Sequence, residues 1–236
     1  MGDSTGRSWG GLLGRLGAPR RPGSEESTES ASSPAVAPTG AAYPTKALKK
    51  FLATLTSRPN PVLLDLGPVV GANVSFFGEQ LGCKILVEDL YGDVERRAGV
   101  DDKAMAEYFA KRFPQASHSI DGILCWDLID FLPPTVAQVM AAQLTRLLSI
   151  DGALLGFFST APVRETTFTK FVVADEHTLR HRPYGPMRTR TRVLQNRDII
   201  KLFEGLRVSD SFLLQTHMRE ILFRKPAYLA GGPVGA

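Results

Sequence analysis

The sequence contains little that would build a metal centre, a disulfide framework or a membrane span. It has four histidines and two cysteines, Cys83 and Cys125, none at metal-ligand spacing. Both cysteines fall in apolar stretches, which predicts buried free thiols and a reducing, cytoplasmic location. No apolar run approaches the ~20 residues that span a bilayer, so no transmembrane segment is expected. The net charge of +4 is too small to argue for nucleic acid, although such a partner is not excluded.

The composition changes near residue 42. Residues 1–42 are rich in glycine, serine, proline and alanine, and such a segment buries too little apolar surface to offset chain entropy. We therefore expect a disordered tail, with a short helix that docks to a partner or a membrane surface as the alternative. That alternative depends on four apolar residues at helical spacing: Trp9, Leu12, Leu13 and Leu16. Residues 43–228 are expected to form one domain, and residues 229–236 a flexible end.

A βαβ unit is predicted near the start of this domain. An apolar run of strand length at residues 62–66 ends at a turn that contains Gly67 and Gly71. A stretch of helix length follows, and then a second apolar run that ends in Glu88 and Asp89. This succession indicates two parallel strands joined by a helix. Because open α/β sheets bind ligands where their parallel strands end, this edge is predicted to hold a cofactor.

The turn in this unit resembles the glycine motif of a known family. The class I S-adenosylmethionine-dependent methyltransferases, above all their small type 11-like branch, carry Asp-x-Gly-x-Gly-x-Gly after the first strand. This chain has Asp65, Gly67 and Gly71 at the family spacing, and Val69 replaces the middle glycine. A second similarity lies at residues 119–132, which look like the fourth strand of the family.

The resemblance, which covers residues 60–226, implies an α/β fold with a Rossmann-like seven-stranded sheet and a C-terminal antiparallel hairpin. We expect that hairpin at residues 207–215 and 218–224. The third strand has no clear counterpart between residues 91 and 119, where only an amphipathic helix at 102–112 is visible, so it is expected to be reduced or missing. A nicotinamide-dependent oxidoreductase is a further alternative, which the hairpin disfavours.

Two more expectations concern the rest of the domain. A helix at residues 45–55 is predicted to pack on the sheet, and Asn196 is predicted to cap a later helix. Residues 159–195 form too long a connection to be a simple loop, so this stretch is expected to shape a substrate pocket.

The family resemblance also implies which residues hold the cofactor. The turn would contact the methionine end of S-adenosylmethionine, the acidic pair after the second strand would bind the ribose, and the cysteine of the fourth strand would lie beside the methyl group. These implied contacts are Asp65, Gly67, Gly71, Glu88, Asp89 and Cys125. No residue is assigned to the adenine.

Two carboxylates after the fourth strand are candidate catalytic residues. Asp127 or Asp130 could act as a base toward a hydroxyl or amine acceptor, because each would lie beside the transferred methyl group. The alternative is a structural carboxylate that caps a helix.

A basic stretch at residues 180–192 contains five arginines. Arg188, Arg190 and Arg192 are predicted to bind an anionic small-molecule or protein acceptor, because a guanidinium group holds carboxylates and phosphates in a bidentate way. The alternative is a solvated loop or edge hairpin whose arginines point outward.

Two classes of function remain open. The first is an S-adenosylmethionine-dependent methyltransferase with an unidentified acceptor, favoured by the retained Gly67 and Gly71. The second is a non-catalytic, methyltransferase-like binding or assembly protein that has lost cofactor binding. It is favoured by Val69 and by the lack of the acidic residue with which the third strand of the family contacts adenine.

Overall fold

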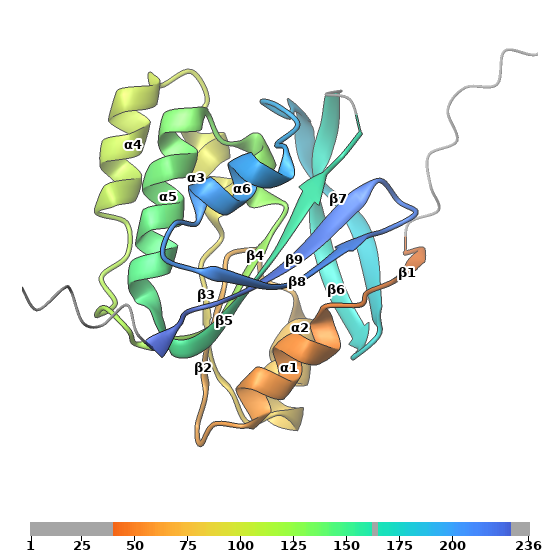
Figure 1. Ribbon diagram of the computed structural model, residues 1–236. Coiled ribbons are helices and arrows are strands. Elements are labelled where there is room, and N and C mark those ends of the chain that lie inside the picture. The colour runs from red at the N-terminus through yellow and green to blue at the C-terminus, as the bar shows by residue number, and fades with distance from the viewer. Residues whose placement is uncertain (1–39, 162–164, 228–236) are drawn as a thin grey trace, which may run out of the picture. The chain divides into compact units, whose positions relative to one another are not determined.

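The computed structural model describes residues 40–161 and 165–227 (Figure 1). The predictions for the tail at residues 1–39, including its docking helix, and for residues 229–236 lie outside the described residues. Within the described ranges, no helix is long and apolar enough to cross a membrane. The same ranges contain no group of three or more His, Cys, Asp or Glu side chains that could hold a metal ion.

The described residues form helices and strands in a mostly alternating order (Figure 1). The strands are β1 (Ala42–Pro44), β2 (Val62–Asp65), β3 (Lys84–Val87), β4 (Ile120–Trp126), β5 (Leu148–Ser159), β6 (Glu165–Asp175), β7 (Thr178–Thr189), β8 (Arg207–Leu213) and β9 (Met218–Arg224). The α-helices are α1 (Leu48–Thr56), α2 (Gly71–Val74), α3 (Leu90–Arg96), α4 (Asp102–Ala110), α5 (Pro134–Leu147) and α6 (Asn196–Leu202). A π-helical turn, η1 (Ser75–Gln80), continues α2, and a 3-10 turn, η2 (Leu128–Phe131), follows β4.

The central sheet has the order β3-β2-β4-β5-β9-β8. Strands β3, β2, β4 and β5 are parallel, whereas β9 is antiparallel to both β5 and β8. The predicted C-terminal hairpin is therefore present, and β9 lies between β5 and β8. All four parallel strands end at one edge of the sheet, which we call the carboxyl edge.

Alternating side chains of the central strands belong to two separate apolar layers. On β4, Ile123 and Cys125 join the layer under α3, α4, α5 and α6, while Leu124 and Trp126 join the layer under α1 and η1. On β5, Leu154 belongs to the first layer. Because side chains alternate along a strand, two covered faces require a nearly continuous apolar run, and β4 and β5 have one.

A second, three-stranded antiparallel sheet has the order β1-β7-β6. Its β6–β7 hairpin lies across the carboxyl edge, since Phe168 packs in the α3–α5 layer and Phe171 packs in the α1 layer. The stretch that was expected to shape a pocket thus forms a long hairpin that contacts both layers of the domain.

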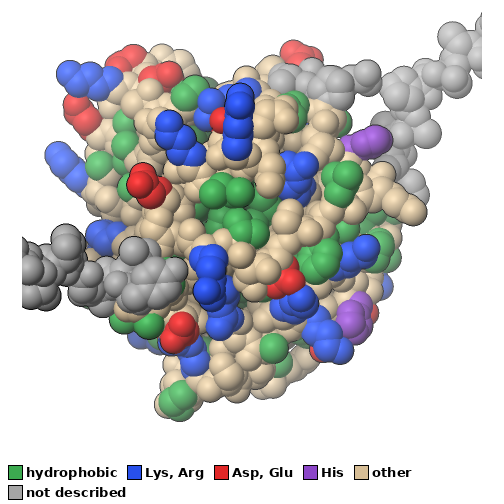
Figure 2. Space-filling view, in the orientation of Figure 1, with side chains coloured by type: hydrophobic (Ala, Val, Ile, Leu, Met, Phe, Trp, Pro, Cys, Tyr) green, Lys and Arg blue, Asp and Glu red, His purple; other side chains and the backbone are tan. Residues whose placement is uncertain are grey.

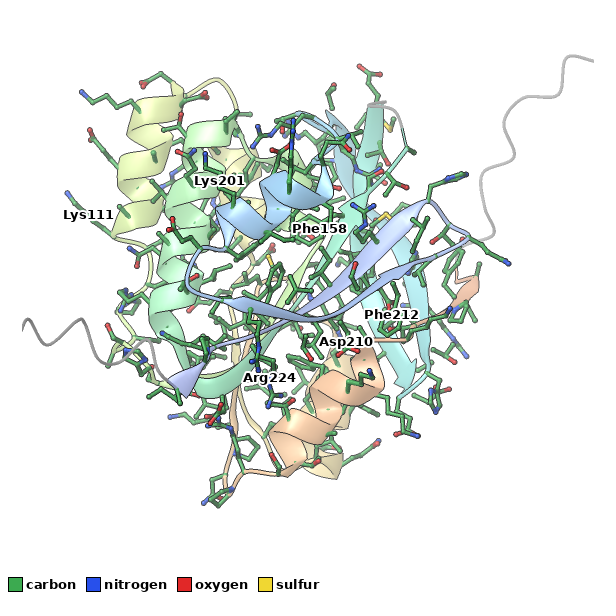
Figure 3. The ribbon with its side chains drawn as sticks, viewed as in Figure 1. Lys111, Phe158, Lys201, Asp210, Phe212 and Arg224 are labelled. Atoms are coloured by element: carbon green, nitrogen blue, oxygen red, sulfur yellow. The ribbon has the colours of Figure 1, made fainter. Side chains whose placement is uncertain are left out.

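Helix α1 begins three residues later than predicted and is capped from a distant strand. The side chain of Glu220, which is 0% exposed, accepts hydrogen bonds from the backbone N–H groups of Lys46 (2.8 Å) and Ala47 (2.9 Å). Strand β8 also holds the helix, because Asp210 pairs with Lys50 (Figure 3). A carboxylate at this end satisfies helix N–H groups and favours the positive end of the helix dipole.

The central sheet has six strands in the described residues, and the third strand of the family pattern, which was expected to be reduced or missing, is not formed there. Two details differ from the sequence predictions. Helix α3 was not predicted: Gly92 weakens its pattern, but the side chain of Asp89 caps it by accepting from Gly92 N (3.0 Å). Asn196 is the first residue of α6 rather than its cap, since Gln195 holds the extended backbone that precedes the helix.

The face in Figure 2 carries scattered Lys and Arg side chains around a central group of apolar side chains between α6 and β8. On this face the basic residues do not gather in one stripe. A continuous basic stripe is the usual electrostatic footprint of nucleic-acid binding, so the visible distribution gives that partner no support.

Candidate functional site at the carboxyl edge

Asp65 ends β2 and is held by groups of the protein itself. Its Oδ1 atom accepts hydrogen bonds from Gly67 N (2.9 Å) and from Trp126 Nε1 (2.6 Å). The residue is 4% exposed. Burial raises the pKa of Asp65 to about 6, against the lowering effect of the hydrogen bonds from Trp126 and Gly67. The carboxylate that would orient a cofactor therefore already has two internal donors.

Trp126 fills the space between the glycine turn and the β6–β7 hairpin. It lies at an irregularity in the β4–β5 pairing and has φ of 51°, a left-handed conformation that is unusual for a bulky residue. Its indole stacks on Phe171 (centroids 5.0 Å apart) and Phe157 (5.8 Å) with nearly parallel planes. A Cβ atom on Gly67 would lie 3.0 Å from this indole. Trp126 thus leaves little room for a side chain at position 67.

The altered part of the glycine turn follows an unstrained path. Neither Gly67, Val69 nor Gly71 is among the residues with positive φ, so a β-branched residue at position 69 carries no backbone penalty. Val69 is 66% exposed. A Cβ atom added to Gly71 would meet nothing within 4 Å. The turn is therefore open to solvent at Gly71 and closed by protein at Gly67.

The acidic pair predicted to bind ribose has internal partners. Asp89, besides capping α3, accepts a hydrogen bond from the Tyr184 hydroxyl of β7 (3.1 Å). Glu88 forms an ion pair with Arg112 (2.7 Å). Burial, followed by the nearby Asp89 carboxylate, raises the pKa of Tyr184, so this hydroxyl remains a donor at neutral pH.

The hairpin is fastened over the turn by one amide. Asn73, which is 3% exposed, donates from Nδ2 to the carbonyl of Phe171 (2.8 Å) and accepts at Oδ1 from Val173 N (2.8 Å). Beyond it, Phe168 packs edge-on against Tyr91 with ring centroids 4.8 Å apart. These contacts hold aromatic side chains of the hairpin against the ends of β2 and β4.

The two candidate catalytic carboxylates are brought together beside one arginine. Arg190 Nη2 lies 3.6 Å from Asp127 Oδ2, and Arg190 Nε lies 3.8 Å from Asp130 Oδ2. Asp127 also accepts from the Tyr91 hydroxyl (2.5 Å), and Asp130 accepts from the backbone N–H of Ser159 (2.7 Å). Burial raises the pKa of both carboxyls, that of Asp130 to about 7.

Cys125 belongs to the buried layer on the α5 side of the sheet and is a free thiol, as is Cys83. Burial raises the pKa of Cys125, and the charges of Asp127 and Asp130 raise it further. The thiol form packs as a small apolar side chain, which matches the expectation of buried free cysteines.

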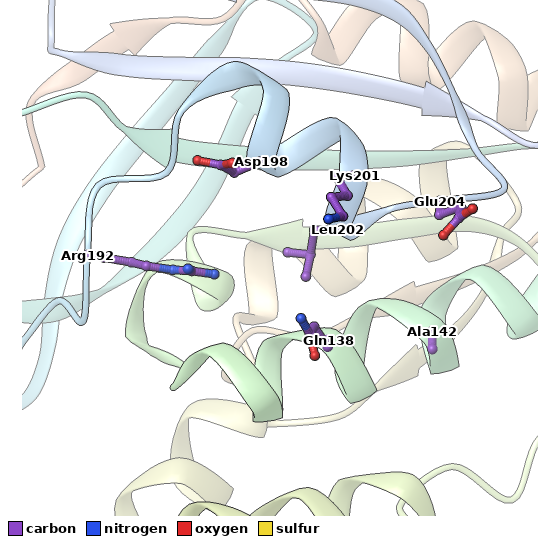
Figure 4. Close-up of a pocket in the computed structure, with 7 residues that line it drawn as sticks. All are labelled: Gln138, Ala142, Arg192, Asp198, Lys201, Leu202 and Glu204. Atoms are coloured by element: carbon purple, nitrogen blue, oxygen red, sulfur yellow. The ribbon is translucent and has the colours of Figure 1, made fainter.

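The three arginines predicted to bind an acceptor lie at three different places. Arg188 lies 3.7 Å from Glu95, at the end of the hairpin near α3. Arg190 joins the carboxylates described above. Arg192 lines a separate cavity of about 570 Å³ between α5 and α6, where Lys201 and Glu204 also lie (Figure 4). Only Arg190 is near the candidate catalytic carboxylates.

The strand order and the antiparallel β9 define a Rossmann-like methyltransferase fold that lacks its third strand. No protein-family model and no curated protein matches the sequence. Solved structures do. A 1,6-didemethyltoxoflavin-N1-methyltransferase from Burkholderia thailandensis, crystallised with bound 1,6-didemethyltoxoflavin and S-adenosylhomocysteine, is 18% identical over 76% of this chain and 78% of its own, with a TM-score of 0.45.

Two further structures have the same general fold. The glycopeptide N-methyltransferase MtfA with S-adenosylmethionine is 13% identical over 76% of this chain and 92% of its own (TM-score 0.44). A putative type 11 methyltransferase from Sulfolobus solfataricus is 13% identical over 80% of this chain and 97% of its own (TM-score 0.42). Similarity at this level concerns the fold and carries no conclusion about what this chain binds.

The residues of the cofactor position do not fit S-adenosylmethionine in the arrangement described. The carboxylates that would take its ammonium and ribose groups are bonded to Trp126 and Tyr184, and the indole of Trp126 covers Gly67. Neither aromatic residue was assigned a role of its own in the sequence predictions. Trp126 belongs to the stretch that resembles the fourth strand of the family, but its left-handed backbone conformation cannot be recognised from the sequence. Tyr184 stood in a stretch that was interpreted through its arginines.

Proposed function

We propose that this protein is a methyltransferase-like binding protein that has lost cofactor binding. The observation that carries the proposal is the Trp126 indole, which is stacked on the hairpin and hydrogen-bonded to Asp65 at the position where the family would hold its cofactor. Opening this position would expose the rings of Phe168 and Phe171, which are 0% and 4% exposed. Each such ring contributes about 1.5–3 kcal/mol by its burial.

Titration calorimetry of the full chain with S-adenosylmethionine and S-adenosylhomocysteine tests this proposal. We expect no saturable heat and no rise in the melting temperature at about 1 mM of either compound, a concentration that would reveal any Kd at or below that value. Stoichiometric binding of either compound by the unmodified chain would contradict the loss of cofactor binding.

The second candidate is an S-adenosylmethionine-dependent methyltransferase whose hairpin opens before the cofactor binds. The open space in front of Gly71 favours it, because the backbone there is accessible to a ligand. The pKa of Asp130, raised to about 7, also suits a base that acts near neutral pH on a small-molecule or protein acceptor. The substrate and the activity are part of this proposal.

A variant of the hairpin fastening separates the two candidates. If the β6–β7 hairpin is a gate, only molecules with an open hairpin bind the cofactor, so the apparent affinity is proportional to the open fraction. A substitution that destabilises the closed hairpin increases this fraction and therefore raises the apparent affinity. Asn73→Ala removes two hydrogen bonds to β6 and should then give measurable S-adenosylmethionine binding. Asn196→Ala, at an exposed asparagine of α6, is the matched control. If a folded Asn73→Ala protein still binds neither compound, the gated enzyme is rejected.

A further inference from the structure

A cavity of about 390 Å³ lies beside the carboxyl edge, apart from the predicted cofactor residues. Its wall combines side chains from β1, β5, β6 and β7, from the residues that follow β4 and β7, and from the turn between β8 and β9. The polar and aromatic groups that matter for recognition are Asp127, Ser159, Phe171, His181, Arg190 and Thr216. A concave site with an apolar wall and a few converging polar groups is the usual form of a small-molecule site.

The polar groups of this cavity keep unused hydrogen-bonding atoms. Asp127 is 1% exposed, and its Oδ2 atom has no hydrogen-bond partner in the described part of the chain. Arg190 Nε and Thr216 Oγ1 are likewise buried without such a partner there. Native proteins leave few buried polar atoms without a hydrogen bond. We therefore infer that these three atoms, on residues that line one cavity, form hydrogen bonds with a bound ligand.

The two charged groups have opposite signs and form a long ion pair without a hydrogen bond between them. Arg190 Nη2 and Asp127 Oδ2 are 3.6 Å apart, beyond hydrogen-bond distance, and Arg190 Nη1 donates instead to Ser159 Oγ (3.1 Å). A ligand that presents a donor to the carboxylate and an acceptor to the guanidinium would complete both. An ammonium group beside a carboxylate group has this arrangement.

The rest of the wall suits an apolar or aromatic side chain. The His181 ring stacks on Tyr43 (centroids 4.2 Å apart) and meets Phe171 edge-on (4.9 Å). Burial lowers the pKa of His181 to about 4, so this ring is neutral at physiological pH and adds no second positive charge.

We propose that this cavity binds a free α-amino acid with a bulky apolar or aromatic side chain, its ammonium group on Asp127 and its carboxylate on Arg190. Thr216 would add a hydrogen bond to the carboxylate. The inference holds for either candidate function, because the cavity uses none of the residues predicted to hold the cofactor.

Titration calorimetry of the full chain with three related probes tests the proposal. L-Phenylalanine carries both charged groups, phenethylamine lacks the carboxylate and 3-phenylpropionate lacks the ammonium. We expect one saturable site for L-phenylalanine and at least tenfold weaker binding of each truncated probe, which corresponds to about 1.4 kcal/mol per lost partner. Equal affinity for 3-phenylpropionate, or no response to any probe at about 10 mM, would overturn the proposal.

Substitutions assign each charge to its partner. Asp127→Asn should weaken L-phenylalanine binding at least tenfold and leave that of 3-phenylpropionate nearly unchanged, whereas Arg190→Gln should weaken both. Arg192→Gln, at an arginine that lines the other cavity, should change neither. If a buried variant fails to fold by circular dichroism, Thr216→Val takes its place, with an expected loss of a few-fold. Unchanged L-phenylalanine affinity in the folded variants would contradict this site.

Discussion

Tyr91 donates a 2.5 Å hydrogen bond to Asp127, and both side chains are buried. The bond joins the first turn of α3 to the end of β4, beneath the hairpin. Burial and the neighbouring Asp127 carboxylate raise the pKa of Tyr91, so its hydroxyl keeps its proton. The carboxylate of Asp127 is thereby fixed with one oxygen toward Tyr91 and the other toward Arg190.

Tyr91→Phe should destabilise the protein, because Asp127 would lose its only hydrogen-bond donor in the described residues. The expected loss is about 1–3 kcal/mol in the free energy of unfolding, the range for a buried polar group left unpaired. Urea denaturation at pH 7 measures it. Tyr43→Phe is the control, since the Tyr43 hydroxyl makes no hydrogen bond to any residue that the structure describes. Equal losses in both variants would show that the hydrogen bond is not the cause.

Asp65→Asn should change how stability depends on pH. The pKa of Asp65 is about 6 in the folded protein against 3.8 for a free side chain, so the folded state holds the proton more tightly and this group lowers stability as pH rises from about 4 to 6. The amide keeps an oxygen for Trp126 and does not titrate. Relative to wild type, the variant should gain up to ~3 kcal/mol between pH 4 and pH 7. Parallel urea midpoints across this range would contradict the shift.

His181→Phe should have the opposite pH dependence. The pKa of His181 falls from 6.5 to about 4 because the ring is buried, so the stability that this group provides is complete above pH 6.5 and is lost as pH falls toward 4. Phenylalanine preserves the stacking and cannot be protonated. The variant should therefore gain up to ~3 kcal/mol over wild type as pH falls through this window. Chemical denaturation at half-unit pH steps measures the gain, with exposed His118→Phe as the control.

Glu220→Ala tests the cap on α1. The variant should lose about 1–3 kcal/mol, since two backbone N–H groups that immediately precede α1 would be left without a partner, and amide exchange at Lys46 and Ala47 should become faster. Glu79→Ala, at an exposed glutamate of η1, should change little. An Ala variant as stable as wild type would show that water replaces the carboxylate without cost.

The parts of the fold that depend on local patterns were predicted from the sequence. The parallel strands appeared as apolar runs because both faces of the sheet are covered, and the β8–β9 hairpin appeared as two short runs close together. Helix α3 escaped prediction because its start depends on the Asp89 cap rather than on apolar periodicity. The missing third strand was visible as the lack of a suitable apolar run.

The closure of the cofactor position could not be predicted in the same way. It depends on the stacking of Trp126 on Phe171, a contact between residues far apart in the chain. It also depends on the left-handed backbone at Trp126, a conformation that the residue type does not predict. The retained Gly67 pointed to a ligand, but the close neighbour of this glycine is an indole of the protein. The same spacing of glycines is therefore compatible with an open or a filled site.

Asn73 also covers part of the edge of an outer strand. Strand β6 is an outer strand of its three-stranded sheet, and such strands offer unpaired backbone groups to other chains. The Asn73 amide takes the Phe171 carbonyl and the Val173 N–H, the two groups that an added strand would use at that point. One side chain thus occupies the two backbone groups of β6 that strand addition at this point would need.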